Sequence, residues 1–188
     1  MIRTLLEEDP VIMAVKNEKT LHAALESDGK IVFLLYGTLP RLEVIVRRVL
    51  GAGKMPFVHV ELVDGLKPDA GLADYFADVF GSECGVITTH TALVARARAL
   101  RVPVIQRVFA VDRRSLEQGE ESLRVALPDA LEIIPGVVPS AIRYFHERFP
   151  ELAIIAGGLI RSKKSMYDVM TNGGVGVSTT DISFWEVG

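Results

Sequence analysis

The sequence Ile154-Ile155-Ala156-Gly157-Gly158-Leu159-Ile160-Arg161-Ser162 has the form of a short apolar strand that runs through two glycines into the start of a helix. A second segment, Gly174-Val175-Gly176-Val177-Ser178-Thr179-Thr180, repeats this form and ends in hydroxyl residues. Glycines let backbone N–H groups approach an anion closely, and a helix N-terminus adds about half a positive charge. We therefore expect a phosphate group to bind where these two strands end.

Eight short runs rich in Val and Ile can be marked along the chain, and most are continuously hydrophobic, as in parallel strands that are covered on both faces. They are Val11–Val15, Ile31–Tyr36, Phe57–Leu62, Gly85–Thr88, Val104–Val108, Ala130–Ile134, Ala153–Ala156 and Gly174–Ser178. Segments with helical spacing of apolar residues lie between them. This alternation predicts an α/β fold, a TIM-like (β/α)8 barrel, with an open doubly wound sheet as the main alternative.

The spacing of the strands sets the size of this barrel. Successive strands start about 23 residues apart, against roughly 31 residues per unit in a typical barrel. We therefore expect a compact barrel with short loops and a truncated last helix, anchored by Phe184 and Trp185. The chain is interpreted as one barrel domain over residues 1–188, with 1–9 as an N-terminal extension and 10–188 as the barrel.

The composition restricts the class of protein. Of the 188 residues 49% are hydrophobic, yet no apolar run approaches the roughly 18 residues that a membrane span needs. A single cysteine, Cys84, forbids an internal disulfide, and no signal peptide is evident, so we expect a cytoplasmic protein. The net charge of −3 argues against bulk electrostatic binding of nucleic acid. No cluster has metal-ligand spacing, and we expect neither a metal nor a cofactor.

Several motifs together are distinctive. They are Val58-His59-Val60-Glu61-Leu62, Ile105-Gln106-Arg107, Glu132-Ile133-Ile134-Pro135-Gly136 and Ile155-Ala156-Gly157-Gly158-Leu159-Ile160. With them the chain, from about Pro10 to Trp185, resembles the glycerol uptake operon antiterminators, which respond to glycerol 3-phosphate. The resemblance implies a TIM-like barrel that binds glycerol 3-phosphate, and an RNA-binding role in which the mRNA leader of a glycerol-utilisation operon is stabilised and premature termination is prevented.

Candidate ligand-binding residues follow from their positions near strand ends. Gly157, Gly158, Ser178 and Thr179 would form the phosphate cradle, with Arg161 as a neutralising cation. The alternative for the glycines is a tight strand-to-helix turn, and for Arg161 a place on the surface.

Polar residues within apolar strands are the second group of candidates. His59 and Glu61 are two apart, so both would face the barrel interior while Val58, Val60 and Leu62 face the helices; the alternative is a satisfied buried pair. Lys16 ends its strand in register with Ile12 and Ala14, and we expect it to be a cation beside the ligand, with an exposed lysine at a helix start as the alternative. Glu132 needs a partner, for which Lys16 or Arg107 is suitable. Gln106 and Arg107 face opposite ways, and we favour Arg107 at the mouth. Gly136 would shape a loop beside the ligand.

The RNA-binding candidates are the arginine-rich face Arg96, Arg98, Arg101, together with Arg113 and Arg114, although such runs are usually solvated helix surfaces. Because RNP-type and KH-type motifs are absent from the sequence, recognition would depend on phosphate contacts and shape, and a homo-oligomer is left open.

An enzyme is the alternative function, namely an isomerase or transferase acting on a phosphorylated glycerol or a small sugar phosphate. His59 with Glu61, or Lys16 with Glu132, would be its acid and base. The short loops argue against a lid that excludes water. A third possibility is a scaffold that has lost both tasks, which the polar residues in the strands argue against.

Overall fold

A computed structural model describes residues 2–185, and within them eight parallel strands close into a barrel in which each strand pairs with the next and the last pairs with the first. The strands are β1 (Val11–Val15), β2 (Ile31–Leu34), β3 (Met55–His59), β4 (Gly85–Thr88), β5 (Val104–Phe109), β6 (Ala130–Ile134), β7 (Ala153–Gly157) and β8 (Gly176–Thr179). The closed ring confirms the predicted barrel and excludes the open sheet.

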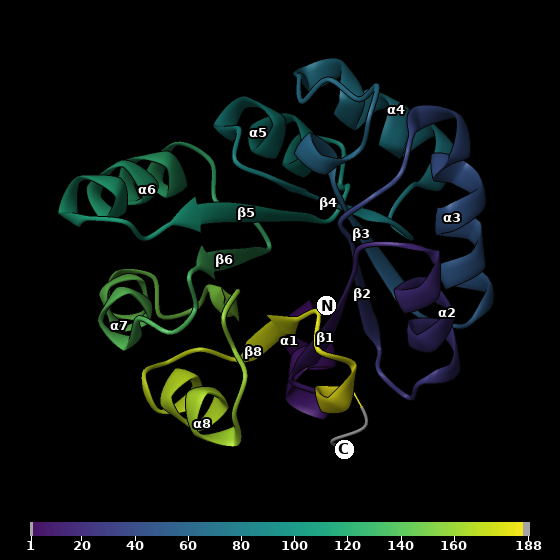
Figure 1. The fold of residues 1–188 in the computed structure, drawn as a ribbon. Coiled ribbons are helices and arrows are strands. Elements are labelled where there is room, and N and C mark those ends of the chain that lie inside the picture. Colours follow the sequence, from purple (N-terminus) through teal and green to yellow (C-terminus); the bar gives the residue numbers. More distant parts are fainter. Residues whose placement is uncertain (1, 186–188) are drawn as a thin grey trace.

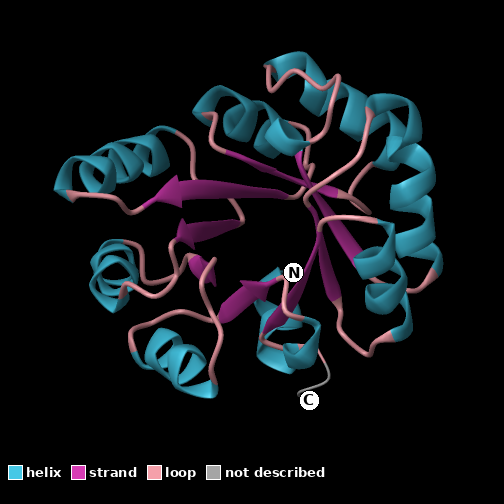
Figure 2. Ribbon diagram, viewed as in Figure 1, coloured by secondary structure: helices cyan, strands magenta, loops and turns pink. Residues whose placement is uncertain are grey.

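Helices form an outer ring around the strands (Figure 1). They are α2 (Glu18–Glu26), α3 (Leu39–Gly51), α4 (Ala70–Phe80), α5 (Thr91–Ala99), α6 (Arg113–Val125), α7 (Pro139–Arg148) and α8 (Lys163–Thr171). Figure 2 shows that strand and helix alternate through this part of the chain. Two 3₁₀ turns, η1 (Val60–Leu62) and η2 (Ile182–Phe184), follow β3 and β8.

Each strand is buried on both faces, which explains the continuous hydrophobic runs. In β1 and β2, Met13 and Leu34 belong to the layer between strands and helices, whereas Ile12 and Phe33 belong to the barrel interior. Phe33 and Phe57 meet inside the barrel at an edge-to-face angle of 68°. Because side chains alternate between the two layers, the odd or even position of a polar residue decides whether it reaches the barrel axis.

The N-terminal residues, interpreted from sequence as an extension, form a helix that closes the base of the barrel. In this helix, α1 (Ile2–Glu8), Ile2 and Leu6 are buried in the interior cluster with residues at the starts of strands, such as Ala130 and Ala153. In Figure 1, α1 lies beside β1 and β8 instead of in the outer ring. Its apolar side chains therefore cover the end of the barrel at which the strands begin.

Local signals account for several element ends. The Asp112 side chain accepts a hydrogen bond from the Ser115 backbone N–H at 2.8 Å and caps α6, as its position predicts. Ser162 caps α8 in the same way. After β8 the chain makes only the short turn η2, and the Trp185 indole N–H donates to the Thr179 carbonyl oxygen at 3.0 Å. Trp185 is buried and Phe184 partly so, which confirms the truncated last helix and its anchors.

Candidate functional site

A cavity of about 420 Å³ opens at the end of the barrel where the strands finish. Its walls come chiefly from the ends of β7 and β8 and the loops that follow them. The lining residues are Ala14, Phe33, Leu35, Arg107, Glu132, Ile134, Gly158, Leu159, Ile160, Arg161, Ser178, Thr179, Thr180 and Asp181. Barrels of this type bind ligands at this end, and the volume falls within the usual range for small-molecule sites.

A buried polar network forms the floor of this cavity. Nε of Arg107 donates to Oε2 of Glu132 at 2.7 Å, and the Ser178 hydroxyl donates to Oε1 of Glu132 at 2.6 Å. Glu132 is fully buried, and Arg107 is 9% exposed. Of the two partners considered for Glu132, the structure gives Arg107. Gln106 faces the helices, where its amide nitrogen donates to the Ser122 hydroxyl at 2.7 Å, so the two residues do point opposite ways.

The two glycines of β7 and its loop have different roles. A Cβ on Gly157 would lie 2.5 Å from Oε1 of Glu132 and 2.7 Å from Oγ of Ser178, so this position must be empty for the network to form. Gly158 has a φ of +73°, which glycine adopts without strain. Leu159 continues the turn at a φ of +60°, where a branched side chain is strained. Gly158 and Leu159 line the cavity, whereas Gly157 lies just behind the lining.

The hydroxyl and charged residues of the mouth divide between the two strand ends. Arg161 is exposed and lines the cavity on the β7 side. On the β8 side, Oγ1 of Thr179 accepts from the Asp181 backbone N–H at 3.1 Å and can still donate its proton, whereas the Ser178 proton is already donated to Glu132. Asp181 was missed from sequence, although a Thr-Thr-Asp run after an apolar strand is a helix-start signal that could have found it.

Two candidates lie outside the cavity. Lys16 follows β1 with an exposed side chain, so it is neither beside the cavity nor the partner of Glu132. The acid–base pair of Lys16 with Glu132 is therefore wrong. The strand ladder stops at Val15, and one residue later the chain turns into the cap of α2, which carries the side chain outward. Gly136 is buried against β7, since a Cβ there would lie 2.7 Å from that of Ala156.

The His59 and Glu61 pair is assembled differently from the prediction. The strand ends at His59 and continues as η1, so Leu62 does not face the helices and is 46% exposed. Nδ1 of His59 still lies 3.2 Å from Oε2 of Glu61, although the two are out of line for a hydrogen bond. Neither residue lines the main cavity. The alternative of a satisfied buried pair does not describe it either, because both ring nitrogens of His59 and Oε2 of Glu61 are buried without a hydrogen-bond partner among residues 2–185.

Glu61 is held by residues that follow β4. Its Oε1 accepts from the Thr88 hydroxyl and the Thr89 backbone N–H, each at 2.7 Å. Burial alone would raise the pKa of Glu61, but the contacts with His59, Thr89 and Thr88 outweigh it and lower the pKa to about 2. The carboxylate is thus ionised and already serves as an acceptor within the protein.

The five arginines predicted for RNA do not form one face. Arg96, Arg98 and Arg101 lie at the end of α5, at the base of the barrel, whereas Arg113 and Arg114 begin α6 at the mouth. Three of them are also paired, Arg96 with Asp74, Arg98 with Asp129, and Arg113 with Glu117 at 2.8 Å. The outer helices of such a barrel run from the mouth to the base. Residues at the end of α5 and residues at the start of α6 therefore lie at opposite ends of the barrel.

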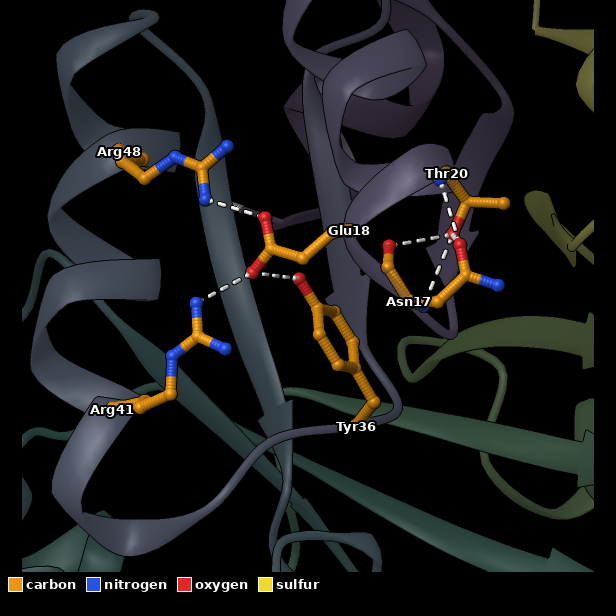
Figure 3. Close-up of polar contacts among 6 residues, drawn as sticks. All are labelled: Asn17, Glu18, Thr20, Tyr36, Arg41 and Arg48. Atoms are coloured by element: carbon orange, nitrogen blue, oxygen red, sulfur yellow. Dashed lines mark hydrogen bonds and ion pairs between the residues drawn. The ribbon is translucent and has the colours of Figure 1, made fainter.

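A further polar cluster joins α2 and α3 at the barrel rim (Figure 3). The Glu18 carboxylate accepts from Arg48 at 2.7 Å, from Arg41 at 3.1 Å and from the Tyr36 hydroxyl at 3.4 Å. Burial and the adjacent Glu18 charge raise the pKa of Tyr36 to about 12. The two arginines of this cluster are therefore engaged in holding α3 against α2.

No group of three or more His, Cys, Asp or Glu side chains among residues 2–185 could hold a metal ion. No helix in the described part of the chain is long and apolar enough to cross a membrane.

Comparison with known proteins identifies relatives over nearly the whole chain. The uncharacterized protein YgcP of Escherichia coli (strain K12) is 31% identical over 183 residues, which are 97% of this chain and 95% of the relative. A glycerol uptake operon antiterminator regulatory protein from Listeria monocytogenes str. 4b F2365 superposes with a TM-score of 0.89 at 27% identity, covering 95% of each chain.

More distant structures share the fold. A glycerol uptake operon antiterminator-related protein from Thermotoga maritima MSB8 has a TM-score of 0.81 at 23% identity, covering 93% of this chain and 96% of its own. Orotidine 5'-phosphate decarboxylase from Pyrococcus horikoshii OT3 has a TM-score of 0.65 at 19% identity, covering 90% and 88%, and shows that enzymes use the same barrel. The family model described as "Glycerol-3-phosphate responsive antiterminator" matches residues 11–185, and the chain belongs to this family.

Proposed function

We propose that this chain is a cytoplasmic, glycerol-3-phosphate-responsive regulator that binds and stabilises the mRNA leader of a glycerol-utilisation operon. The observation that carries the proposal is the cavity at the mouth of the barrel between the ends of β7 and β8. Membership of a family described as glycerol-3-phosphate responsive antiterminators is the reason for proposing this ligand and this regulatory role. The cavity supplies a polar, partly enclosed place of suitable size for a small phosphorylated molecule.

The phosphate group would bind on the β7 side of this cavity. The turn through Gly158 and Leu159 brings main chain to the cavity wall, and Arg161 adds a positive charge. The carboxylate of Asp181 on the β8 side would repel a phosphate of charge about −1.5 to −2. We therefore assign the anion to the loop of residues 158–161, with the Thr179 hydroxyl as a donor from the other side.

The glycerol hydroxyls would face the floor and the β8 side. A carboxylate offers about four acceptor positions, and the two contacts from Arg107 and Ser178 leave Glu132 able to accept more. Asp181 is a second acceptor at the rim. Because the buried Glu132 charge is balanced by Arg107, a neutral hydroxyl fits this floor better than a second anion.

A regulator is favoured over an enzyme by the state of the polar residues. The Lys16 acid–base pair of the enzyme alternative is not formed. In the other pair, Oε1 of Glu61 accepts from Thr88 and Thr89, and neither His59 nor Glu61 lines the cavity. Ligand binding would act by population shift, with glycerol 3-phosphate favouring one conformation or oligomer that binds RNA. The ligand achieves this only if its affinity differs between the two states.

Thermal unfolding in the presence of glycerol 3-phosphate, glycerol and inorganic phosphate tests the ligand. A ligand at 100 times its Kd stabilises the folded state by about 2.7 kcal/mol. We expect a rise in the unfolding midpoint with glycerol 3-phosphate and little with glycerol. Titration of labelled leader RNA at two salt concentrations, with and without ligand, tests the regulator. Absence of RNA binding under every condition would exclude the RNA-binding role and favour the enzyme.

A further inference from the structure

The base of the barrel, opposite the ligand cavity, carries two adjoining cavities of different character. One, of about 480 Å³, is lined by Ile2, Arg3, Ser82, Arg98, Arg101, Val102, Pro103 and Asp129. The other, of about 390 Å³, is lined by Leu127, Pro128, Asp129, Phe149, Pro150, Glu151 and Leu152. Asp129 borders both, and Arg3 donates to the Glu151 carbonyl oxygen at 3.1 Å, which links their walls. The first is cationic and the second mainly apolar.

The cationic cavity holds more positive charge than the fold requires. Arg98 pairs with Asp129, which also accepts from the Val104 backbone N–H at 2.9 Å. Arg3 and Arg101 have no carboxylate within ion-pair distance among residues 2–185. Three arginines against one aspartate leave a charge of about +2 on this cavity, and Glu151 of the adjoining cavity lowers the total over both to about +1, on a chain whose net charge is −3.

The backbone at Arg101 is unusual for an arginine. Helix α5 ends in a Schellman motif, in which the Val102 N–H donates to the Ala97 carbonyl at 2.9 Å and the Arg101 N–H donates to that of Arg98 at 3.2 Å. Arg101 occupies the left-handed position of this motif, at a φ of +59°, where glycine is the usual residue. An arginine occupies a position where glycine would be less strained, and its side chain lines the cavity.

Arg3 is also placed against its local preference. It lies in the first turn of α1, where the helix dipole disfavours a positive charge. Its guanidinium nevertheless reaches across the base to the loop before β7. Neither arginine is therefore accounted for by helix capping, and both line the same cavity.

We propose that these cavities bind one nucleotide unit of single-stranded RNA, with a phosphate on Arg3, Arg98 and Arg101 and a base in the apolar cavity beside Phe149. A phosphate beside an aromatic, apolar recess is the arrangement by which proteins bind unpaired nucleotides. This inference rests on the RNA-binding role proposed above and assigns it to the base of the barrel. Glycerol 3-phosphate and RNA would then bind at opposite ends and could be bound together.

Binding of a short fluorescein-labelled oligoadenylate, measured by anisotropy over a range of salt concentrations, tests the assignment. Arg101→Gly and Arg3→Gln are each expected to weaken binding roughly tenfold and to reduce the magnitude of the salt slope by about 0.7. Phe149→Leu keeps an apolar side chain but removes the ring, over which the Arg124 guanidinium lies at 5.7 Å, and a loss of about fivefold or more is expected. Lys19→Gln, which removes an exposed positive charge in α2, is the matched control and should bind like the unmodified chain.

The Arg101→Gly variant separates binding from folding, because glycine suits the left-handed position. Its unfolding midpoint should not fall, so weaker binding would not reflect a damaged fold. Equal binding by the unmodified chain, Arg101→Gly and Arg3→Gln would overturn the assignment and leave the RNA-binding role intact. No binding of any RNA by the unmodified chain would overturn both. If the chain bound adenosine monophosphate but did not bind the oligonucleotide, the assignment to RNA would be overturned in favour of a free nucleotide.

Discussion

The buried pair of Arg107 and Glu132 provides a test in which the size of the effect follows from the geometry. Arg107→Met and Glu132→Met each leave one charge in the barrel without its partner. Removal of one member of a buried pair typically costs 3–5 kcal/mol, and we expect about 3 kcal/mol because the cavity beside the pair admits water. For a chain of this length that is a fall of roughly 6–12 °C in the unfolding midpoint.

The double variant should be much less destabilised than the two single changes suggest. With both charges replaced by apolar side chains, no charge remains unpaired. The loss of unfolding free energy in the double variant should therefore be about 3 kcal/mol smaller than the sum of the losses in the two single variants. Urea unfolding followed by circular dichroism gives the free energies of all four proteins. The exposed pair of Arg113 and Glu117 is the control, with an expected coupling of about 0.3–0.5 kcal/mol.

The same variants connect the floor of the cavity to the ligand. The double variant should fold yet lose the stabilisation by glycerol 3-phosphate, because the acceptors for the hydroxyls are gone. If the two changes proved additive within about 0.5 kcal/mol, the pair would not be coupled and our account of the floor would be wrong. An intact response to the ligand in a folded double variant would place the glycerol moiety elsewhere.

Other changes have expected outcomes as well. Gly157→Ala should cost about 1–3 kcal/mol and abolish the thermal response to glycerol 3-phosphate, because its Cβ would lie 2.5 Å from the buried carboxylate; an unchanged response would contradict this. The pKa of Glu61, about 2, is below its ordinary value of 4.5, so its contribution is present above about pH 4.5 and is lost as the pH falls toward 2. Urea unfolding of Glu61→Gln should therefore show a deficit of the order of 2 kcal/mol near neutral pH that shrinks in acid, after allowance for partial exposure, whereas a pH-independent deficit would argue against ionisation. Asp112→Ala should cost about 1 kcal/mol in thermal unfolding, and Thr38→Ala, whose side chain makes no capping bond, should cost less; equal losses would show that the cap is not the cause.

Much of the fold could be predicted because the strands are buried on both faces. The bounds of β1, β4 and β6 agree with the sequence, since a strand between a packed interior and a ring of helices has apolar residues at every position. Strand ends at the mouth were less predictable. The strand predicted over Phe57–Leu62 continues beyond His59, the last residue of β3 that pairs with β4. Only the turn into η1 shows where the pairing stops.

The candidate site was predictable where the alternation of strand residues decides it. Alternation allowed only one of Gln106 and Arg107 to reach the barrel axis, and Arg107 was favoured and offered as one of two partners for Glu132. The structure brings Arg107 and Glu132 to one cavity with Gly158, Arg161, Ser178 and Thr179. Lys16 failed because it lies one residue beyond its strand, where alternation no longer applies. The helix over residues 2–8 was missed as well, although its apolar residues at positions 2, 5 and 6 have helical spacing.

The pairing of β1 with β8 has a consequence for the order of events during synthesis. Val11 lies opposite Val177, so the ring cannot close until β8 has left the ribosome. Until then the two edge strands present unpaired N–H and C=O groups and apolar faces to their surroundings. A nascent chain of this protein should accordingly remain open to chaperones, and to association with other chains, from the synthesis of β1 until that of β8.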